Sequence, residues 1–452
     1  MFAPELCEQT VTAQFGRTPE ELGIGAAPGV IRAVGALLQT LRSLQKTDLS
    51  HIRELDYYLS GRFMELDLAA RRNLELTQTL RGKEKRGSLL WVLDKARTPM
   101  GSRMLRSWLD KPLLNPAAIG KRLSAVEELK DRNLEREELI RVLREVTDLE
   151  RVMARIVTGA ANARDLQSLA QGSRTLPQLK EELSRFQSSM LRVICEELDE
   201  LTDLRELIDR AIADEPPLTV REGGMIRPGY DERIDQLRDI MSGGKGALAS
   251  IEAREKEKTG IKNLRVGYNR VFGYYIEVAK GQIDLVPASY IRKQTLVNGE
   301  RYITEELKDL ENTILNAKDR VTALEYELFT DLRRHLAEQA ERVQRTSRCV
   351  AAADVLSCFA QTAVENHYCR PEVDLSGEID ITDGRHPVVE RVLKRELFVP
   401  NDTYMGSSEN RAAIITGPNM AGKSTYMRQV ALIVLMAQIG SFVPAKTARI
   451  GL

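Results

Sequence analysis

Residues 412–436 read AAIITGPNMAGKSTYMRQVALIVLM and decide the class of fold in this part of the chain. Within this stretch, Gly417 to Ser424 match the Gly-x-x-x-x-Gly-Lys-Ser pattern of a phosphate-binding P-loop. Small residues let consecutive backbone N–H groups approach phosphate oxygens closely. Lys423 supplies a positive charge for the phosphates, and the Ser424 hydroxyl is a ligand for Mg²⁺. The loop therefore predicts a site for a nucleoside triphosphate.

The flanks of the loop have the order that such a site requires. Ala412 to Thr416 is a short apolar run, typical of a buried strand that feeds the loop. Thr425 to Met436 is largely apolar and of helical length, and a helix beginning here adds its positive dipole end to the phosphate cradle. This context disfavours the alternative, a Gly-rich turn with a Lys-Ser pair by chance. The candidate nucleotide-binding residues of the loop are Gly417, Pro418, Asn419, Met420, Ala421, Gly422, Lys423, Ser424 and Thr425.

The composition of the 452 residues is neutral and favours helices. Lys plus Arg number 66 and Asp plus Glu number 66, which argues against a generally basic nucleic-acid coat but allows a local basic patch. Aromatic residues make up only 5%, while Leu, Glu and Arg are abundant, a composition typical of long helices. The sequence shows no secretory signal and no apolar run of the ~20 residues that span a bilayer. We expect a soluble, cytoplasmic protein.

The five cysteines are odd in number and irregularly spaced, which indicates a reducing compartment rather than a disulfide framework. Cys349, Cys358, His367 and Cys369 are close enough in sequence to raise the question of zinc. Their gaps fit no standard ligand pattern, so we expect buried apolar roles for these thiols. The four scattered histidines allow no Ser/His/Asp or Cys/His arrangement of a hydrolase.

Two segments have the apolar spacing of paired helices. From Leu307 to Leu328, apolar residues recur in alternating steps of three and four, the seam of a coiled coil. Ile234 to Ile251 follow the same steps, with Gly244 in one position. We expect the two arms of one antiparallel helical pair; two separate amphipathic surface helices are the alternative.

Residues 262–303, between the two arms, have the period of strands. Apolar residues alternate over 264–268 and over 274–278, with a turn between them. Asn298-Gly299 predicts a hairpin because both residues tolerate positive φ. We expect a small β module at the joined end of two long helices.

This module is basic in an otherwise neutral chain. Its seven cations face three acids, Glu277, Asp284 and Glu300, so 7 − 3 gives a formal charge of +4. Each cation alone is more often a solvated surface residue, but a basic, aromatic-rich cluster can hold a phosphate backbone. The cations are Lys262, Arg265, Arg270, Lys280, Arg292, Lys293 and Arg301, and the candidate DNA-binding residues among them are Lys262, Arg270, Arg292, Lys293 and Arg301.

With the P-loop and the helical pair in view, the sequence closely resembles the MutS family of DNA mismatch repair ATPases. The loop stands as GPNMAGKSTYMRQVALIVLMAQIGSFVPA over residues 417–445. The likeness covers nearly all 452 residues and is highly specific. It continues in RRNLEL at 71–76, TPMGSRML at 98–105, EKEKTG at 255–260, FGYYI at 272–276, RYI at 301–303 and GRHPVVE at 384–390.

The resemblance implies a mainly α fold with long lever helices, a helical core, a small β-rich clamp and the opening of an α/β P-loop ATPase domain. Residues 1–30 look like the end of a connector domain and 31–261 like the core and first lever arm. Residues 262–303 look like the clamp, 304–370 like the second lever arm returning to the core, and 371–452 like the N-terminal part of the ATPase domain.

The resemblance also implies ATP and Mg²⁺ as cofactors and mismatched double-stranded DNA, a second copy of the chain and MutL as partners. Asn419, Lys423 and Ser424 match the positions that hold phosphates and Mg²⁺. Phe398 matches the position whose ring stacks on adenine, although a core aromatic is the alternative. Ala421 stands where many relatives have Gly, a mild change at a tight turn.

Two departures from the family pattern concern function. The family's mismatch-reading domain and its Walker B carboxylates have no counterpart in these residues, so we expect a fragment that binds nucleotide without hydrolysing it. A clamp-lacking MutS-like ATPase outside mismatch repair is an alternative, against which the insert at 262–303 argues. A P-loop coiled-coil chromosome scaffold is another, but there the loop would precede the coil.

Overall fold

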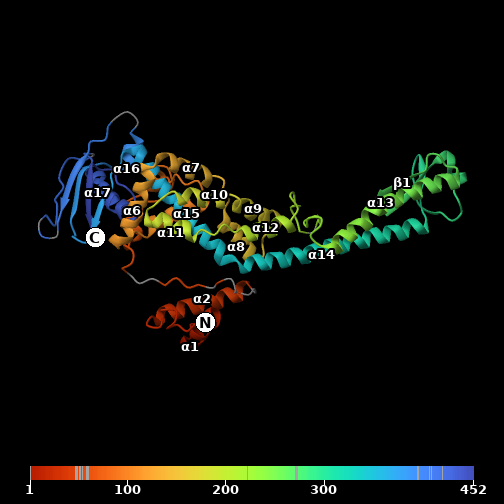
Figure 1. Cartoon of the computed structure of the whole chain (residues 1–452), viewed down its shortest axis with the longest axis horizontal. Coiled ribbons are helices and arrows are strands. Elements are labelled where there is room, and N and C mark those ends of the chain that lie inside the picture. The colour runs from red at the N-terminus through yellow and green to blue at the C-terminus, as the bar shows by residue number, and fades with distance from the viewer. Residues whose placement is uncertain are drawn as a thin grey trace. The chain divides into compact units, whose positions relative to one another are not determined.

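The structure is a computed structural model that describes residues 2–45, 49, 52, 54–57, 61–220, 222–269, 273–393, 397–406, 408, 410–419 and 421–452. These residues are mainly helical with two four-stranded sheets, which confirms the mainly α class (Figure 1). The chain forms two compact units. Unit 1 comprises Met1–Val157, Ser168–Arg205 and Ala337–Leu452, and unit 2 comprises Thr158–Gln167 and Glu206–Leu336. No helix within the described ranges has the length and apolar character to cross a membrane.

Unit 1 is built around the long helix α15 (Ala340–Asn366), which is buried over most of its surface, including Cys349 and Cys358. Helices α4, α5, α6, α7, α8 and α11 pack against it. The helices of unit 1 are α1 (Pro4–Phe15), α2 (Pro28–Gln45), α3 (Leu68–Asn73), α4 (Leu89–Leu93), α5 (Pro99–Asp110), α6 (Pro116–Asp131), α7 (Asn133–Leu143), α8 (Leu149–Val157), α10 (Leu176–Ser184), α11 (Ser189–Glu197), α15, α16 (Pro387–Val392) and α17 (Lys423–Gln438). A boundary between the two units falls within each of two further helices, α9 (Ala163–Ser173) and α12 (Thr202–Ala211).

A buried carboxylate joins α15 to the start of α5. Asp354 is 1% exposed and accepts hydrogen bonds from the backbone N–H groups of Arg97 and Thr98 and from the Thr98 hydroxyl, the last two at 2.7 Å. Thr98 in turn caps α5 by accepting the N–H of Gly101 at 2.9 Å. A Cβ on Gly101 would lie 2.3 Å from an Asp354 oxygen. The Thr-Pro-Met-Gly motif is therefore the docking site for this aspartate.

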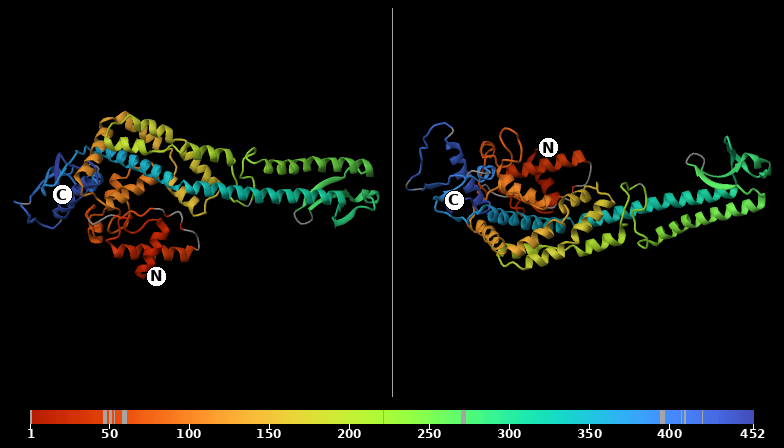
Figure 2. Two further views of the ribbon diagram at one scale, coloured as in Figure 1. Left: turned by 60° about the horizontal axis from the view of Figure 1, so that its bottom comes forward. Right: turned by 90° about the horizontal axis from the view of Figure 1, so that it is seen from above.

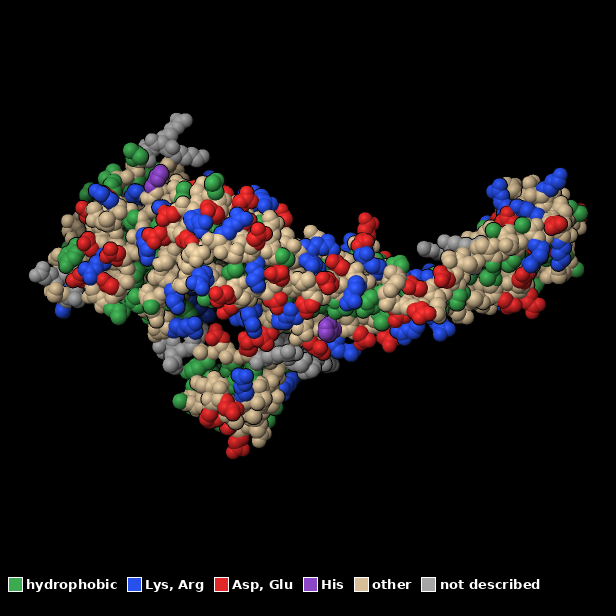
Figure 3. All heavy atoms as spheres, in the orientation of Figure 1, with side chains coloured by type: hydrophobic (Ala, Val, Ile, Leu, Met, Phe, Trp, Pro, Cys, Tyr) green, Lys and Arg blue, Asp and Glu red, His purple; other side chains and the backbone are tan. Residues whose placement is uncertain are grey.

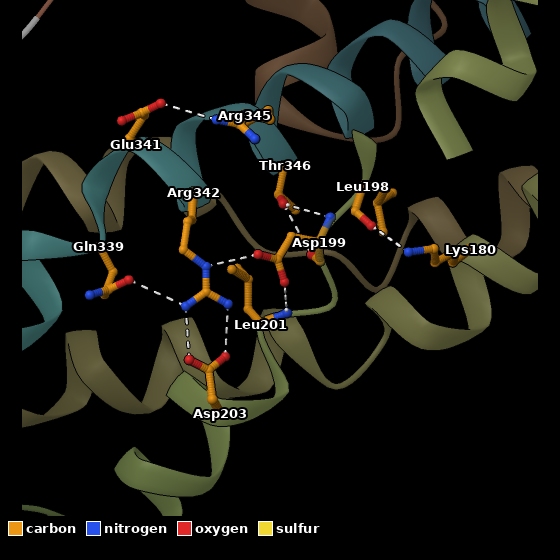
Figure 4. Close-up of polar contacts among 10 residues, drawn as sticks. All are labelled: Lys180, Leu198, Asp199, Leu201, Asp203, Gln339, Glu341, Arg342, Arg345 and Thr346. Atoms are coloured by element: carbon orange, nitrogen blue, oxygen red, sulfur yellow. Dashed lines mark hydrogen bonds and ion pairs between the residues drawn. The ribbon is translucent and has the colours of Figure 1, made fainter. Parts of the chain in front are cut away.

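The first turns of α15 are held by a second polar cluster (Figure 4). The Arg342 guanidinium bonds Asp199 at 2.9 Å and reaches both oxygens of Asp203 at 2.8 and 3.0 Å. This guanidinium holds the pKa of Asp203 below its usual range. Thr346 adds two bonds to the backbone of Asp199, at 3.0 and 3.2 Å. The 198–203 segment is thereby fixed to the N-terminal end of α15.

The remaining part of unit 1 is a sheet with two helices. Its strands are β5 (Glu372–Asp374), β6 (Ile379–Gly384), β7 (Asn401–Met405) and β8 (Thr447–Gly451), in the order β5-β8-β6-β7. β5 and β8 are parallel, and the other pairs are antiparallel. The apolar residues predicted to form a helix after the P-loop lie in α17, whose Leu432, Ile433, Leu435 and Met436 are buried, so that prediction is confirmed.

The buried strand predicted over Ala412 to Thr416 is wrong. The segment forms no strand, and all of its residues are exposed, Ile414 to 92%. A strand needs a neighbouring strand to pair its backbone N–H and C=O groups, and neither sheet of the described residues includes this segment. Apolar character alone indicated burial, but without a pairing partner the run stays at the surface.

Unit 2 contains the helical pair and its insert. α13 (Glu232–Thr259) and α14 (Glu305–Glu338) run side by side in opposite directions, with the sheet at their joined end (Figures 1 and 2). The antiparallel pair and the β-rich insert are therefore confirmed. The strands β1 (Arg265–Asn269), β2 (Gly273–Ala279), β3 (Ile291–Thr295) and β4 (Gly299–Ile303) have the antiparallel order β1-β2-β4-β3, and the 3₁₀ helix η1 (Lys280–Leu285) joins β2 to β3. One apolar core, including Ile251, Leu264, Ile276 and Leu307, joins the sheet to both helices.

A buried glutamate secures α14 further along the pair. Glu325 is fully buried and accepts the N–H groups of Gly224 and Met225 at 2.6 and 2.9 Å. Arg238 of α13 donates to its other oxygen at 2.7 Å and to the Ile226 carbonyl oxygen at 2.7 Å. The pair is thus cross-linked by side chains at the start of α13 as well as at the sheet.

The hairpin predicted at Asn298-Gly299 is present between β3 and β4, but its glycine serves another purpose. Neither residue has a positive φ. Gly299 already belongs to β4 and pairs with Ala279. A Cβ there would lie 2.4 Å from the Val278 carbonyl oxygen, so the close approach of β2 requires glycine. The prediction of the turn is confirmed, and the reason given for it is wrong.

Candidate functional site

The P-loop leads directly into α17. Gly417 has a φ of 152° and Gly422 a φ of 87°, in the region that favours glycine. Gly422 is the residue before the helix, and Lys423 is the first helical residue. Gly417, Pro418, Asn419, Ala421 and Gly422 are exposed. Met420 lies outside the described residues.

The first turn of α17 presents donors to the loop. No side chain caps the helix, and no acidic residue lies in its first turn, so its N–H groups and positive dipole end face outward. The Lys423 ammonium donates to the Gly417 carbonyl oxygen across the loop. The side chain of Ser424 is exposed beside it, and Thr425 is half-buried. This donor set fits a polyphosphate with a Mg²⁺ ion at the serine hydroxyl.

Contacts at both ends of α17 fix the position of this turn. The hydroxyls of Tyr426 and Thr403 lie 2.9 Å apart, which joins the first turns of α17 to β7. At the other end, Arg122 of α6 donates to the Ile439 carbonyl oxygen at 2.9 Å. The first turns of α17 are therefore held against the sheet, and its C-terminal end is held against the helical core of unit 1.

Phe398 is half-buried in the segment that leads into β7. The next strand residues, Asp402 and Thr403, contact the Tyr426 hydroxyl of α17. The segment that carries Phe398 therefore enters the strand beside the first turns of the P-loop helix.

His386, within the Gly-Arg-His-Pro-Val motif, was not predicted to have a particular role. Its Nδ1 accepts the N–H groups of Val388 and Val389, each at 3.3 Å, and so caps α16. Burial, together with the charge of Arg428, lowers the pKa of His386 to about 4. The imidazole must be neutral to accept these bonds.

We expect the stability of the chain to decrease between pH 6.5 and pH 4 partly through His386. Its pKa of about 4 in the folded chain is below its ordinary value of 6.5, so the unfolded state takes up the proton first. The stabilisation is complete above pH ~6.5 and is lost as the pH falls towards the folded pKa, with a slope of at most about 1.4 kcal/mol per pH unit. Urea denaturation at several pH values measures this slope. His386→Asn keeps a capping acceptor without the titration and should flatten the curve, whereas an equal slope in both proteins would contradict the assignment.

The β1–β4 sheet and the segments that flank its strands present exposed cations to solvent. Lys262, Arg265, Lys280 and Lys293 are exposed, and within the described part of the chain none of them forms an ion pair. In Figure 3, several Lys and Arg side chains are visible on the surface around the sheet, with Asp and Glu side chains among them. Arg265 and Lys280 were counted in the basic cluster from the sequence but were not among its candidate DNA contacts. Arg270, which was, lies outside the described residues.

Two of the predicted contacts are engaged inside the sheet. Arg301 bonds Glu277 at 2.9 Å and Gln294 at 3.0 Å, and its guanidinium lies 4.1 Å from the centre of the Tyr275 ring. Its side chain is only 18% exposed. Arg292 lies 3.3 Å from Glu300 but remains 64% exposed.

These pairs set the charge that solvent sees. Two of the three acids are neutralised by neighbouring arginines, which leaves four described cations against Asp284. The register of β3 shifts between Arg292 and Gln294, so Lys293 is the extra residue of a β-bulge on an edge strand. Such a surface attracts a ligand with several negative charges.

The comparisons with known proteins agree on one family. The model of MutS domain III matches residues 69–360, and the model of MutS domain V matches residues 413–452. The DNA mismatch repair protein MutS of Acetivibrio thermocellus is 53% identical over 422 residues, 93% of this chain and 48% of that protein. The protein of the same name from Caldanaerobacter subterraneus subsp. tengcongensis is 51% identical over 448 residues, 99% of this chain and 51% of that protein. The chain spans about half the length of the curated relatives it matches.

Proposed function

The chain belongs to the MutS family, and from this premise we propose that it holds duplex DNA through the β1–β4 sheet and binds ATP at its P-loop. The observation that carries the DNA proposal is the pairing within the sheet. Glu277 and Glu300 form ion pairs with arginines. The exposed Lys262, Arg265, Lys280 and Lys293 are therefore able to bind phosphates. We propose that these cations bind backbone phosphates, which carry no sequence information, so that binding is independent of sequence. The sheet thus corresponds to the family's clamp.

ATP is held by the first turn of α17 and by the loop before it. The backbone N–H groups and Lys423 bind the phosphates, with Lys423 leaving the Gly417 carbonyl oxygen to do so, and Ser424 binds Mg²⁺. Asn419 adds an exposed amide to the phosphates, and Phe398 provides an aromatic face for the adenine. We propose that bound ATP shifts the chain between two DNA-bound states, because a ligand that binds one state better shifts the equilibrium towards it.

For the chain itself we propose binding rather than hydrolysis. Lys423 and Ser424 suffice to hold MgATP. The Mg²⁺ arrives with the phosphates, because Mg²⁺ usually keeps several waters and binds through one or two protein oxygens together with substrate phosphates.

The other assignments follow from family membership. We propose a second copy of the chain and MutL as partners, and mismatched duplex DNA as the substrate of the family's activity. Residues 31–261 and 304–370 form the core and lever arms, 371–452 form the ATPase part, and 1–30 the connector end. Helix α2 begins at Pro28, before the proposed boundary at residue 30, so the connector end includes the first residues of this helix. The β1–β4 sheet between α13 and α14 favours this branch over the clamp-lacking MutS-like proteins.

Replacing Lys262, Arg265 and Lys293 together with Ala should weaken duplex binding at any sequence. Each lost phosphate contact lowers the slope of log K against log salt by about 0.9. We expect the slope to fall by roughly 2 to 3 and the affinity at low salt by at least about tenfold. A salt titration with a fluorescent duplex measures both quantities.

The matched control removes three exposed cations from elsewhere in unit 2, namely Arg210, Lys318 and Arg320. The control changes net charge equally and should leave the slope within about 0.5 of the unmodified chain. If both triple variants lose the same slope, general electrostatics explain the binding, and the sheet is not the DNA site.

A further inference from the structure

Unit 1 contains a cavity lined by charged side chains that have no role in the DNA or ATP binding proposed above. It measures about 430 Å³ and lies where α3 and the segment after it meet α5. Its charged lining residues are Arg71, Arg72, Lys83, Arg106 and a single acid, Asp110. Four cations around one cavity repel one another unless anions lie among them.

The one acid of the lining is already engaged. Arg71 bonds the Asp110 carboxylate at 3.0 Å and the Asp110 carbonyl oxygen at 3.1 Å. Arg72, Lys83 and Arg106 are exposed, and in the described parts of the chain none of them forms an ion pair. Three positive charges therefore face the cavity without a counter-charge from the protein.

The wall of the cavity is shaped by its own hydrogen bonds. The Thr79 N–H donates to the Glu84 carbonyl oxygen at 2.9 Å, and the Lys83 N–H donates to the Thr79 carbonyl oxygen at 3.1 Å, which fixes the backbone at Lys83. The Leu80 N–H donates to the Glu75 carboxylate at 2.7 Å. Thr77 and Thr79 add hydroxyl groups to the lining. The cavity is thus preformed, and its polar atoms suit an oxygen-rich ligand.

We propose that this cavity binds a phosphate group. Phosphate oxygens accept hydrogen bonds from arginine and lysine, and arginine can bind two of these oxygens with its fork of N–H groups. The volume lies within the range of about 300–1,000 Å³ typical of small-molecule sites. The phosphate belongs either to a free phosphorylated small molecule or to the backbone of a bound nucleic acid. This proposal does not rest on the DNA or ATP assignments above.

The test uses the chain with Lys423→Ala, so that the P-loop does not dominate phosphate binding. Isothermal titration with inorganic pyrophosphate should show one site. Adding Arg72→Ala and Arg106→Ala should weaken it by at least about tenfold, because each substitution removes charged hydrogen bonds to the phosphate oxygens. The control pair, Arg81→Ala and Arg86→Ala, removes two exposed arginines of the neighbouring segment that do not line the cavity. We expect the control to change the affinity by less than about twofold.

A duplex DNA arm identifies the source of the phosphate. We call the variant with Arg72→Ala and Arg106→Ala the cavity pair. If only its binding of pyrophosphate is weaker, the result supports a free phosphorylated ligand. Weaker duplex binding in the cavity pair, with the control pair unchanged, supports a backbone phosphodiester. If the cavity pair and the control pair behave alike in both arms, the proposal is overturned. Circular dichroism shows whether each variant is folded. Lys83→Ala provides an independent single substitution in the lining of the cavity.

Discussion

Replacing Lys423 with Ala is expected to weaken ATP binding by about 10- to 100-fold, because one charged hydrogen-bond donor to phosphate contributes ~1.5–3 kcal/mol. The ammonium already reaches across the loop to the Gly417 carbonyl oxygen, so a short movement brings it to the phosphates. The other donors at this site are backbone N–H groups, which carry only partial charge. Lys423 is therefore the main positive charge of the site.

Fluorescence anisotropy with a labelled ATP analogue measures this effect. Lys446→Ala is the matched control, since Lys446 is an exposed lysine of the same unit that precedes β8. It should leave the affinity within about twofold. Ser424→Ala should reduce the dependence on Mg²⁺ more than the affinity for the metal-free nucleotide. Equal affinities for the unmodified chain and Lys423→Ala would exclude the P-loop as the nucleotide site.

Gly101→Ala is expected to destabilise unit 1 by about 2–4 kcal/mol, the range for overpacking combined with a disturbed buried hydrogen bond. The added methyl would lie 2.3 Å from Asp354 Oδ2, the atom that accepts hydrogen bonds from the Thr98 N–H and hydroxyl. Burial raises the pKa of Asp354, and these donors offset part of that cost. Moving the carboxylate away breaks the bonds, and leaving it in place creates a clash.

Urea denaturation followed by circular dichroism measures the loss. Gly120→Ala is the control: it lies within α6, and a Cβ there meets no atom within 4 Å. Because alanine favours a helix over glycine by about 0.5–1 kcal/mol, this substitution should be neutral or stabilising. If Gly101→Ala were as stable as the unmodified chain, the α5–α15 junction would accommodate a larger side chain than the structure allows.

Features with a local cause could be predicted from the sequence. The heptad spacing predicted the helical pair, because apolar residues three and four positions apart share one face of a helix. The alternation over 262–303 predicted strands, and the loop pattern located the start of α17 within the correct turn. Each of these signals depends on residues a few positions apart, so no tertiary information was needed.

Features that depend on pairing partners could not be predicted. Arg301 looked like an exposed cation, but the register of β2 and β4 places it opposite Glu277. The apolar run before the P-loop looked like a buried strand but has no strand beside it among the described residues. Gly101 and Asp354 are more than 250 positions apart, and a single sequence gives no sign that they meet.

The same limit applies to the candidate DNA site. The sequence located the basic module but did not show which of its cations are free of ion pairs. The fold decides this, because it places Glu277 beside Arg301 and Glu300 beside Arg292. Arg265 and Lys280 therefore join Lys262 and Lys293 as exposed cations of residues 262–303 that form no ion pair within the described part of the chain.

The central claim, that the β1–β4 sheet holds DNA, is tested most directly by photo-cross-linking from the sheet. Val297 lies in the β3–β4 hairpin loop and is 88% exposed, so a benzoylphenylalanine there should not disturb packing. We predict cross-links to duplexes of unrelated sequence that disappear at high salt, and few from the same group at Leu134 of α7, which is 78% exposed. Cross-links from Leu134 as strong as those from Val297, or none from Val297 at low salt, would contradict the account.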